Sequence, residues 1–270
     1  MKNAGADIAK CAFMPKKESD TDHVMAASAW AGKNLGIPYL VISMGASGSD
    51  SRVSCAVYGD AFTFGCLPGE ASAPGQREVG QLRSELKEAE ERRSCGGFLF
   101  LTGFMGAGKS SAARRLSKML DLPVIEMDRL IEEAAGCSIP EIFRDKGEEG
   151  FREMETHLFA RLWKRERAIV STGGGAVLRE ENRALMHALG TVVHLEVQPE
   201  TVYRRLSGKS GNRPNLKNRM TEEGIRELMK AREPFYRDAC DFSADTEGKN
   251  IAEVAEEICG LCGDNFVVAR

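Results

Sequence analysis

The sequence predicts an α/β protein in which helices cover both faces of a parallel β-sheet. Three observations indicate this class. Short apolar runs typical of buried strands alternate with helical patterns along most of the 270 residues. A glycine-rich loop joins one of these strands to one of these helices. Hydrophobic residues make up 42% of the chain and charged residues 29%, which is the balance of a globular protein with a sizeable core.

The first part of the chain, residues 1–92, indicates three βα units. Its predicted strands are 8–14, 39–44 and 62–65, and its predicted helices are 21–34, 51–58 and 76–94. Three units are too few for a closed eight-unit barrel, which needs about 250 residues. We place a linker at residues 93–97, because a Ser-Cys-Gly-Gly joint follows the last of these helices.

The second part, residues 98–270, continues the alternation around one parallel sheet. Its predicted strands are 98–102, 123–127, 168–171 and 191–197, with a weak fifth at 241–245. Its predicted helices are 109–120, 128–135, 139–146, 148–166, 180–188, 199–206, 221–239 and 250–262.

Composition and charge exclude several classes of protein. The chain holds 37 Lys and Arg against 40 Asp and Glu, so we expect no nucleic-acid binding through bulk positive charge. The sequence has neither an apolar run long enough for a membrane span nor a signal-peptide core at its start. We therefore expect a cytoplasmic protein whose eight cysteines are thiols. Cys259 and Cys262 form a lone C-x-x-C without further zinc ligands, so we interpret them as ordinary helix residues.

The glycine-rich loop, residues 103–110, fits the pattern G-x-x-x-x-G-K-[ST] between a predicted strand and a predicted helix. Such a loop surrounds phosphate oxygens with backbone N–H groups, and the helix N-terminus adds positive potential. Lys109 would reach the β- and γ-phosphates, and the Ser110 hydroxyl could ligate Mg²⁺. The alternative is a glycine-rich turn that binds nothing. The small domain and the absence of a guanine-reading N/T-K-x-D motif favour a small-molecule kinase.

Three further groups of residues follow the predicted strands or lie on nearby helices. Open α/β sheets bind ligands at the carboxyl ends of their strands. Glu126 and Asp128 should lie on the same side of a strand end, to serve Mg²⁺ and a substrate hydroxyl, unless they are helix caps. Arg152 and Glu155 share a helix face, in a site or as a solvated ion pair. Residues 173–175 are glycines that let backbone approach a ligand, unless the turn is merely loose.

Two cationic features complete the candidate site. Residues 207–218, which contain Arg213, resemble a closing lid that delivers charge to a phosphoryl group, the alternative being a surface loop. Arg232 precedes Pro234 near an expected helix kink, where a lone arginine is commonly a surface residue.

These motifs, taken in order over residues 98–262, resemble shikimate kinase, a family with the nucleoside-monophosphate-kinase-like fold of three layers. The resemblance implies transfer of a phosphoryl group from ATP to the 3-hydroxyl of shikimate, on the route to chorismate and the aromatic amino acids, by a monomeric kinase domain. It implies that ATP binds at Gly106, Ala107, Gly108, Lys109, Ser110, Ser111 and Arg213, with Arg205 weakly matching an adenine contact. It implies that Mg²⁺ binds at Ser110 and Glu126. At the position of Glu126 the family usually has Asp. It implies that shikimate binds at Asp128, Arg152, Glu155, Gly173, Gly174, Gly175 and Arg232, with Asp128 taking the proton of the 3-hydroxyl.

The first part of the chain resembles the C-terminal portion of type I 3-dehydroquinate dehydratase, a (β/α) barrel, in the segments around residues 5–10, 44–45, 51–52 and 71–76. This resemblance implies a Schiff-base lysine at Lys10, a carboxylate-binding arginine at Arg52, and substrate contacts at Ser72 and Gln76. None of the four histidines precedes Lys10, where the family's catalytic histidine lies. We therefore expect no dehydratase activity, and we expect that the partial barrel is either loosely folded or pairs with another chain.

Two rival interpretations remain open. One is a bifunctional dehydratase and kinase whose barrel is completed in trans or upstream. The other is a nucleotide-binding scaffold whose first part docks a partner.

Overall fold

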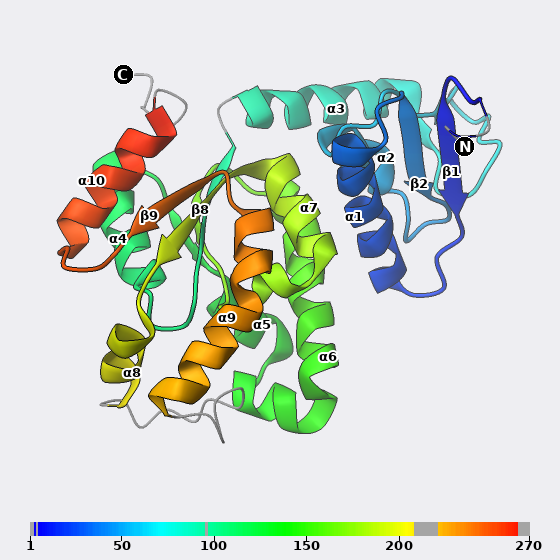
Figure 1. The fold of residues 1–270 in the computed structure, drawn as a ribbon. Coiled ribbons are helices and arrows are strands. Elements are labelled where there is room, and N and C mark those ends of the chain that lie inside the picture. The colour runs from blue at the N-terminus through cyan, green and yellow to red at the C-terminus, as the bar shows by residue number, and fades with distance from the viewer. Residues whose placement is uncertain (1–2, 4, 95–96, 208–220, 264–270) are drawn as a thin grey trace. The chain divides into compact units, whose positions relative to one another are not determined.

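The computed structural model describes residues 3, 5–94, 97–207 and 221–263 (Figure 1). The chain divides into two compact units. The first comprises residues 1–97, 159–166 and 180–189, and the second comprises residues 98–158, 167–179 and 190–270. Within the described ranges no helix is long and apolar enough to cross a membrane.

The first unit contains two short parallel pairs of strands. β1 (Ala9–Phe13) pairs with β2 (Tyr39–Ser43), and β3 (Gly65–Cys66) pairs with β4 (Arg77–Glu78). β2 is buried along its whole length, whereas β1 is largely exposed. The helical elements of this unit are α1 (Glu18–Asn34), α2 (Ser51–Val57), α3 (Val79–Ser94), η2 (Leu162–Lys164) and α7 (Glu180–Leu189).

Two predicted elements of this unit are wrong in part. Residues 62–64 form no strand. Phe62 and Phe64 pack edge to face on each other, with ring centroids 5.8 Å apart. The strand begins only at Gly65. The helix predicted over residues 76–94 begins at Val79, because the backbone just before it pairs with β3.

The second unit is built on the predicted parallel sheet, whose five strands lie in the order β6-β7-β5-β8-β9. Their bounds are β5 (Phe98–Thr102), β6 (Val124–Glu126), β7 (Ile169–Ser171), β8 (Gly190–Glu196) and β9 (Phe242–Asp245). The helical elements are α4 (Lys109–Leu120), α5 (Met127–Ala135), most of α6 (Ile139–Ala160), η3 (Ala176–Leu178), α8 (Pro199–Ser207), α9 (Glu222–Ala239) and α10 (Ile251–Cys262). The α/β class is confirmed. Each predicted strand and helix of this part is present, with bounds that agree within a few residues. The exception is the helix predicted over residues 148–166, which ends at Ala160.

The alternation of side chains along β5 separates two faces of the sheet. Leu99 and Leu101 join a core cluster that also includes residues of α4 and α10. Phe98 and Phe100 contact each other and so share the opposite face. Cys259 packs against the first cluster and Cys262 belongs to it, as expected for ordinary residues of an amphipathic helix.

Candidate active site

The phosphate loop opens on a cavity of about 970 Å³ in the second unit. Gly106 (φ 83°) and Gly108 (φ 103°) take left-handed backbone conformations, which residues with a Cβ atom rarely adopt. Gly108 is the N-cap of α4, so the positive end of that helix faces the cavity. The local geometry is that of an anion site.

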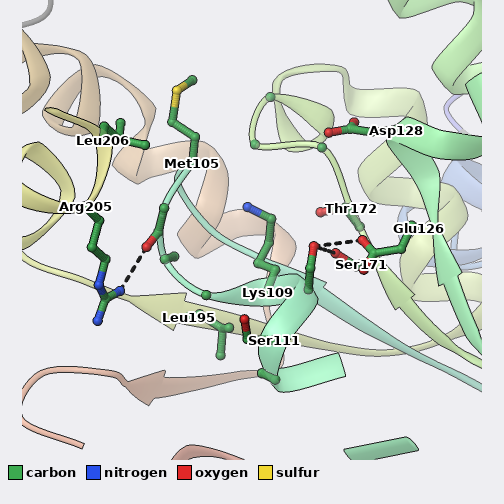
Figure 2. Close-up of a pocket in the computed structure, with 18 of the residues that line it drawn as sticks. Met105, Lys109, Ser111, Glu126, Asp128, Ser171, Thr172, Leu195, Arg205 and Leu206 are labelled. Carbon is green, nitrogen blue, oxygen red and sulfur yellow. Dashed lines mark hydrogen bonds between the residues drawn. The ribbon is translucent and has the colours of Figure 1, made fainter. Parts of the chain in front are cut away.

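Lys109 is the first residue of α4 and is buried. Its Nζ donates to the carbonyl oxygens of Gly103 at 2.7 Å and Phe104 at 3.1 Å, so the ammonium group lies inside the curve of the loop. Figure 2 shows this side chain between the phosphate loop and Thr172. A cation at this place can balance the charge of a bound phosphate.

Ser110, Glu126 and Ser171 bring three oxygen atoms together beside the loop. The Ser110 hydroxyl donates to Glu126 Oε2 at 2.8 Å and lies 3.3 Å from Ser171 Oγ (Figure 2). Glu126 and Ser171 are register partners at the ends of β6 and β7. Hydroxyl and carboxylate oxygens are the ligands that Mg²⁺ prefers, so this donor set suits the ion.

Asp128 is not on a strand, and the predicted alternation with Glu126 is wrong. Helix α5 begins at Met127, so the side chains after Glu126 follow the helical rotation of about 100° per residue. Neither carboxylate makes a side-chain cap: Glu126 is the N-cap residue without such a bond, and Asp128 lies in the first turn. Both still line the cavity. The Asp128 carboxyl is open to that cavity, and burial among the surrounding protein raises its pKa, while Lys109 opposes the rise.

Arg152 and Glu155 form a buried ion pair on α6, with Nη1 and Oε2 2.8 Å apart. The alternative of a solvated surface pair is therefore wrong. A Cβ atom at Gly175 would lie 2.1 Å from Arg152 Nη2, and one at Gly173 would lie 2.8 Å from Glu155 Oε1. The glycine turn is thus packed tightly against this pair rather than loose.

Arg232, on α9, is buried and lines the same cavity, so it is not a surface residue. Its Nη1 lies 3.4 Å from the carbonyl oxygen of Gly174. Arg205 also lines the cavity and donates to the carbonyl oxygen of Gly106 at 2.9 Å (Figure 2). Arg213 and nearly all of the expected lid lie outside the described residues.

The sequence model of the shikimate kinase family matches residues 105–262. The chain belongs to the shikimate kinase family. The shikimate kinase of Geobacter metallireducens is 45% identical over 162 residues, which are 60% of this chain and 89% of that protein. One from Thermus thermophilus is 43% identical over 161 residues, 60% of this chain and 87% of that protein. The solved shikimate kinase of Acinetobacter baumannii, in complex with shikimate, has a TM-score of 0.58 and 32% identity, covering 63% of this chain and 96% of that one.

The part that precedes the kinase region matches a second family model, type I 3-dehydroquinase, over residues 1–92. Arg52 is buried and donates to the carbonyl oxygens of Gly75 and Phe64. Lys10 is exposed, with Nζ 4.5 Å from the centroid of the Phe64 ring. Ser72 donates to Gln76 Oε1 at 3.0 Å, and Gln76 donates to the carbonyl oxygen of Gly65. Lys10 and Arg52 therefore share Phe64 as a neighbour.

Some residues of the kinase site were not predicted. Thr246, Lys249 and Asn250 line the cavity just beyond β9. Their position after a strand was the available signal, but that strand was predicted only weakly. Tyr236, one helical turn after Arg232, donates to the carbonyl oxygen of Gly174. The spacing of four residues was the signal for it.

Proposed function

We propose that the chain transfers the γ-phosphoryl group of ATP to the 3-hydroxyl of shikimate, with Mg²⁺ as cofactor. One observation carries this proposal. A single cavity holds an anion-binding loop with Lys109, a carboxylate at Asp128, and two buried arginines, Arg152 and Arg232. A site with these groups can bind a nucleotide at one end and a hydroxylated carboxylate at the other.

On the nucleotide side, the backbone N–H groups of residues 106–111 surround the phosphates, and Lys109 neutralises charge that develops on the transferring group. Arg213 brings a second cation from the lid. Ser110 and Glu126 would hold Mg²⁺, which when bound would neutralise part of the negative charge of the phosphates. Glu126 keeps the charge of the usual aspartate and is longer by one methylene.

On the substrate side, Arg152 and Arg232 bind the carboxylate of shikimate, and Glu155 fixes the orientation of Arg152. Residues 173–175 offer backbone groups to the ring hydroxyls. Asp128 accepts the proton of the 3-hydroxyl as the new O–P bond forms and the bond between the γ-phosphorus and the leaving oxygen of ADP breaks. Catalysis then rests on positioning and charge stabilisation.

We propose that residues 1–92 form a separate domain, joined by residues 93–97 to the kinase domain of residues 98–270. In this domain Lys10 would be the Schiff-base position of a dehydratase, with Arg52, Ser72 and Gln76 as substrate contacts. A Schiff-base lysine acts while desolvated, and Lys10 is exposed. We therefore propose that this chain lacks dehydratase activity by itself. The bifunctional alternative needs the barrel around Lys10 to be completed, either in trans or by an upstream segment.

We also propose a cytoplasmic location and a monomeric kinase domain. The cysteines in the described residues are free thiols, which suits a reducing compartment.

Measurement of ADP release from the full chain, with and without shikimate, tests the proposed function. We expect turnover that requires both shikimate and Mg²⁺, with shikimate 3-phosphate as product. Equal ADP release without shikimate, or none with it, would favour the scaffold interpretation.

A further inference from the structure

The Tyr236 hydroxyl makes one of the shortest contacts in the kinase site. Tyr236 is 4% exposed, and its hydroxyl donates to the carbonyl oxygen of Gly174 at 2.5 Å. Arg232 reaches the same oxygen from one turn earlier on α9, but at 3.4 Å. The carbonyl therefore has one strong donor and one weak donor, both from the same helix.

Gly174 lies where the two halves of the site meet. A Cβ atom at this residue would be 3.2 Å from the backbone nitrogen of Met105, so the turn is in contact with the phosphate loop. The neighbouring glycines pack on the other side against Arg152 and the carboxylates of Asp128 and Glu155. The orientation of the Gly174 peptide thus affects the spacing between the nucleotide side and the substrate side.

The Tyr236 ring is itself held in place. It stacks on His194 of β8, with ring centroids 4.6 Å apart and an interplanar angle of 19°. His194 is the register partner of Thr102, the last residue of the strand that leads into the phosphate loop. Burial lowers the pKa of His194 to about 4, so the stack carries no charge near neutral pH. A neutral, stacked ring fixes the direction of the hydroxyl.

We infer that Tyr236 is a positioning residue that releases Arg232 for the substrate carboxylate. The inference rests on the proposed role of Arg232. When the guanidinium turns to a carboxylate it leaves the Gly174 oxygen, and a buried carbonyl without a donor is unfavourable. Because Tyr236 keeps that oxygen bonded, the arginine can move without this cost and the glycine turn stays in place.

The test is Tyr236→Phe, which keeps the ring and its stacking on His194 and removes only the hydroxyl. We expect KM for shikimate to rise about tenfold, a loss on the scale of one buried hydrogen bond, while KM for ATP stays within about twofold. Tyr203→Phe on α8 is the matched control, since Tyr203 is 37% exposed, and it should change neither constant. An unchanged KM for shikimate in folded Tyr236→Phe would overturn the inference, as would an equal rise in both constants.

A double-mutant cycle separates release of Arg232 from a general structural effect. With Arg232→Ala there is no guanidinium to release, so adding Tyr236→Phe should leave KM for shikimate nearly unchanged. An analogue with a hydroxymethyl group in place of the carboxylate should likewise bind equally to the wild type and to Tyr236→Phe. Additive effects in the cycle would refute the inference. Failure of the proposed function is distinguishable, because then the wild type itself would show no shikimate-dependent ADP release.

Discussion

Arg152 and Glu155 form an ion pair that is almost completely withdrawn from water, with side chains 7% and 0% exposed. Arg152 of this pair lines the cavity that also contains Asp128. Removing one partner of such a pair strongly destabilises the fold, because the remaining charge stays buried without its counter-charge. The pair therefore joins the stability of the domain to the orientation of Arg152, for which we propose a substrate-binding role.

Replacing Glu155 by Ala should lower the free energy of unfolding by about 3 kcal/mol or more, since it leaves the Arg152 guanidinium buried. Chemical denaturation measures this change. Glu148→Ala is the matched control: Glu148 contacts the same arginine at 3.2 Å but is 54% exposed, so its loss should cost less than about 1 kcal/mol. Equal costs for the two variants would contradict the importance of burial.

Replacing Arg152 by Lys keeps the charge and removes the forked geometry that suits a carboxylate. We expect KM for shikimate to rise by about tenfold or more, with KM for ATP close to that of the wild type. Steady-state kinetics with each substrate varied in turn checks this. A parallel loss of ATP affinity would mean that the helix is misfolded or that the residue has another role.

Replacing Lys109 by Ala removes the cation inside the phosphate loop. Turnover should fall by about 10³ or more, which is the scale of charge stabilisers in phosphoryl transfer. Lys118→Ala, in the last turn of the same helix, should leave turnover unchanged. Near-normal kcat in Lys109→Ala would contradict the assignment of the loop.

Replacing Asp128 by Asn should lower kcat by about 10² or more, the range for loss of a general base. The wild type should also show a characteristic pH dependence. Burial raises the pKa of Asp128, so this carboxyl takes up its proton at a higher pH than an ordinary aspartate. As the pH falls, kcat/KM should therefore begin to decline at a higher pH than it would with an unperturbed carboxylate. In Asp128→Asn that limb of the profile should disappear, and its persistence would assign the titration to another group.

Treatment of the full chain with dehydroquinate and borohydride should leave Lys10 unmodified, because Lys10 is exposed to solvent and not enclosed in a desolvated barrel interior, where a Schiff-base lysine acts. Mass spectrometry of the peptide that contains Lys10 is the measurement. A substrate-dependent adduct together with turnover would instead show that the barrel is completed, in trans or upstream, and the bifunctional interpretation would replace ours.

The parts of the site that the sequence predicted well are local in the chain. The phosphate loop depends on a strand, a turn and a helix that follow one another, and helix α4 has the predicted bounds Lys109–Leu120. The pairing of Arg152 with Glu155 follows from helical spacing, but its burial does not, because the glycine turn that covers it comes from another part of the chain. The stacking of His194 on Tyr236 is likewise a long-range contact that no local pattern records. The boundary errors near Gly65 and Met127 occur where backbone pairing or an early helix start overrides side-chain pattern.

The tight packing of the glycine turn has a consequence for the mutational tolerance of the chain. At Gly175 any β-carbon would displace the Arg152 guanidinium, so in a saturation library selected for growth without aromatic amino acids this position should accept glycine alone. Gly136 needs glycine for a different reason: its φ is 67°, and nothing lies within 4 Å of the place its β-carbon would take. Asn and Asp reach that conformation at modest cost, so both should survive at position 136. The selected population should thus contain only glycine at position 175 but also Asn and Asp at position 136, although both residues are glycine in the printed sequence.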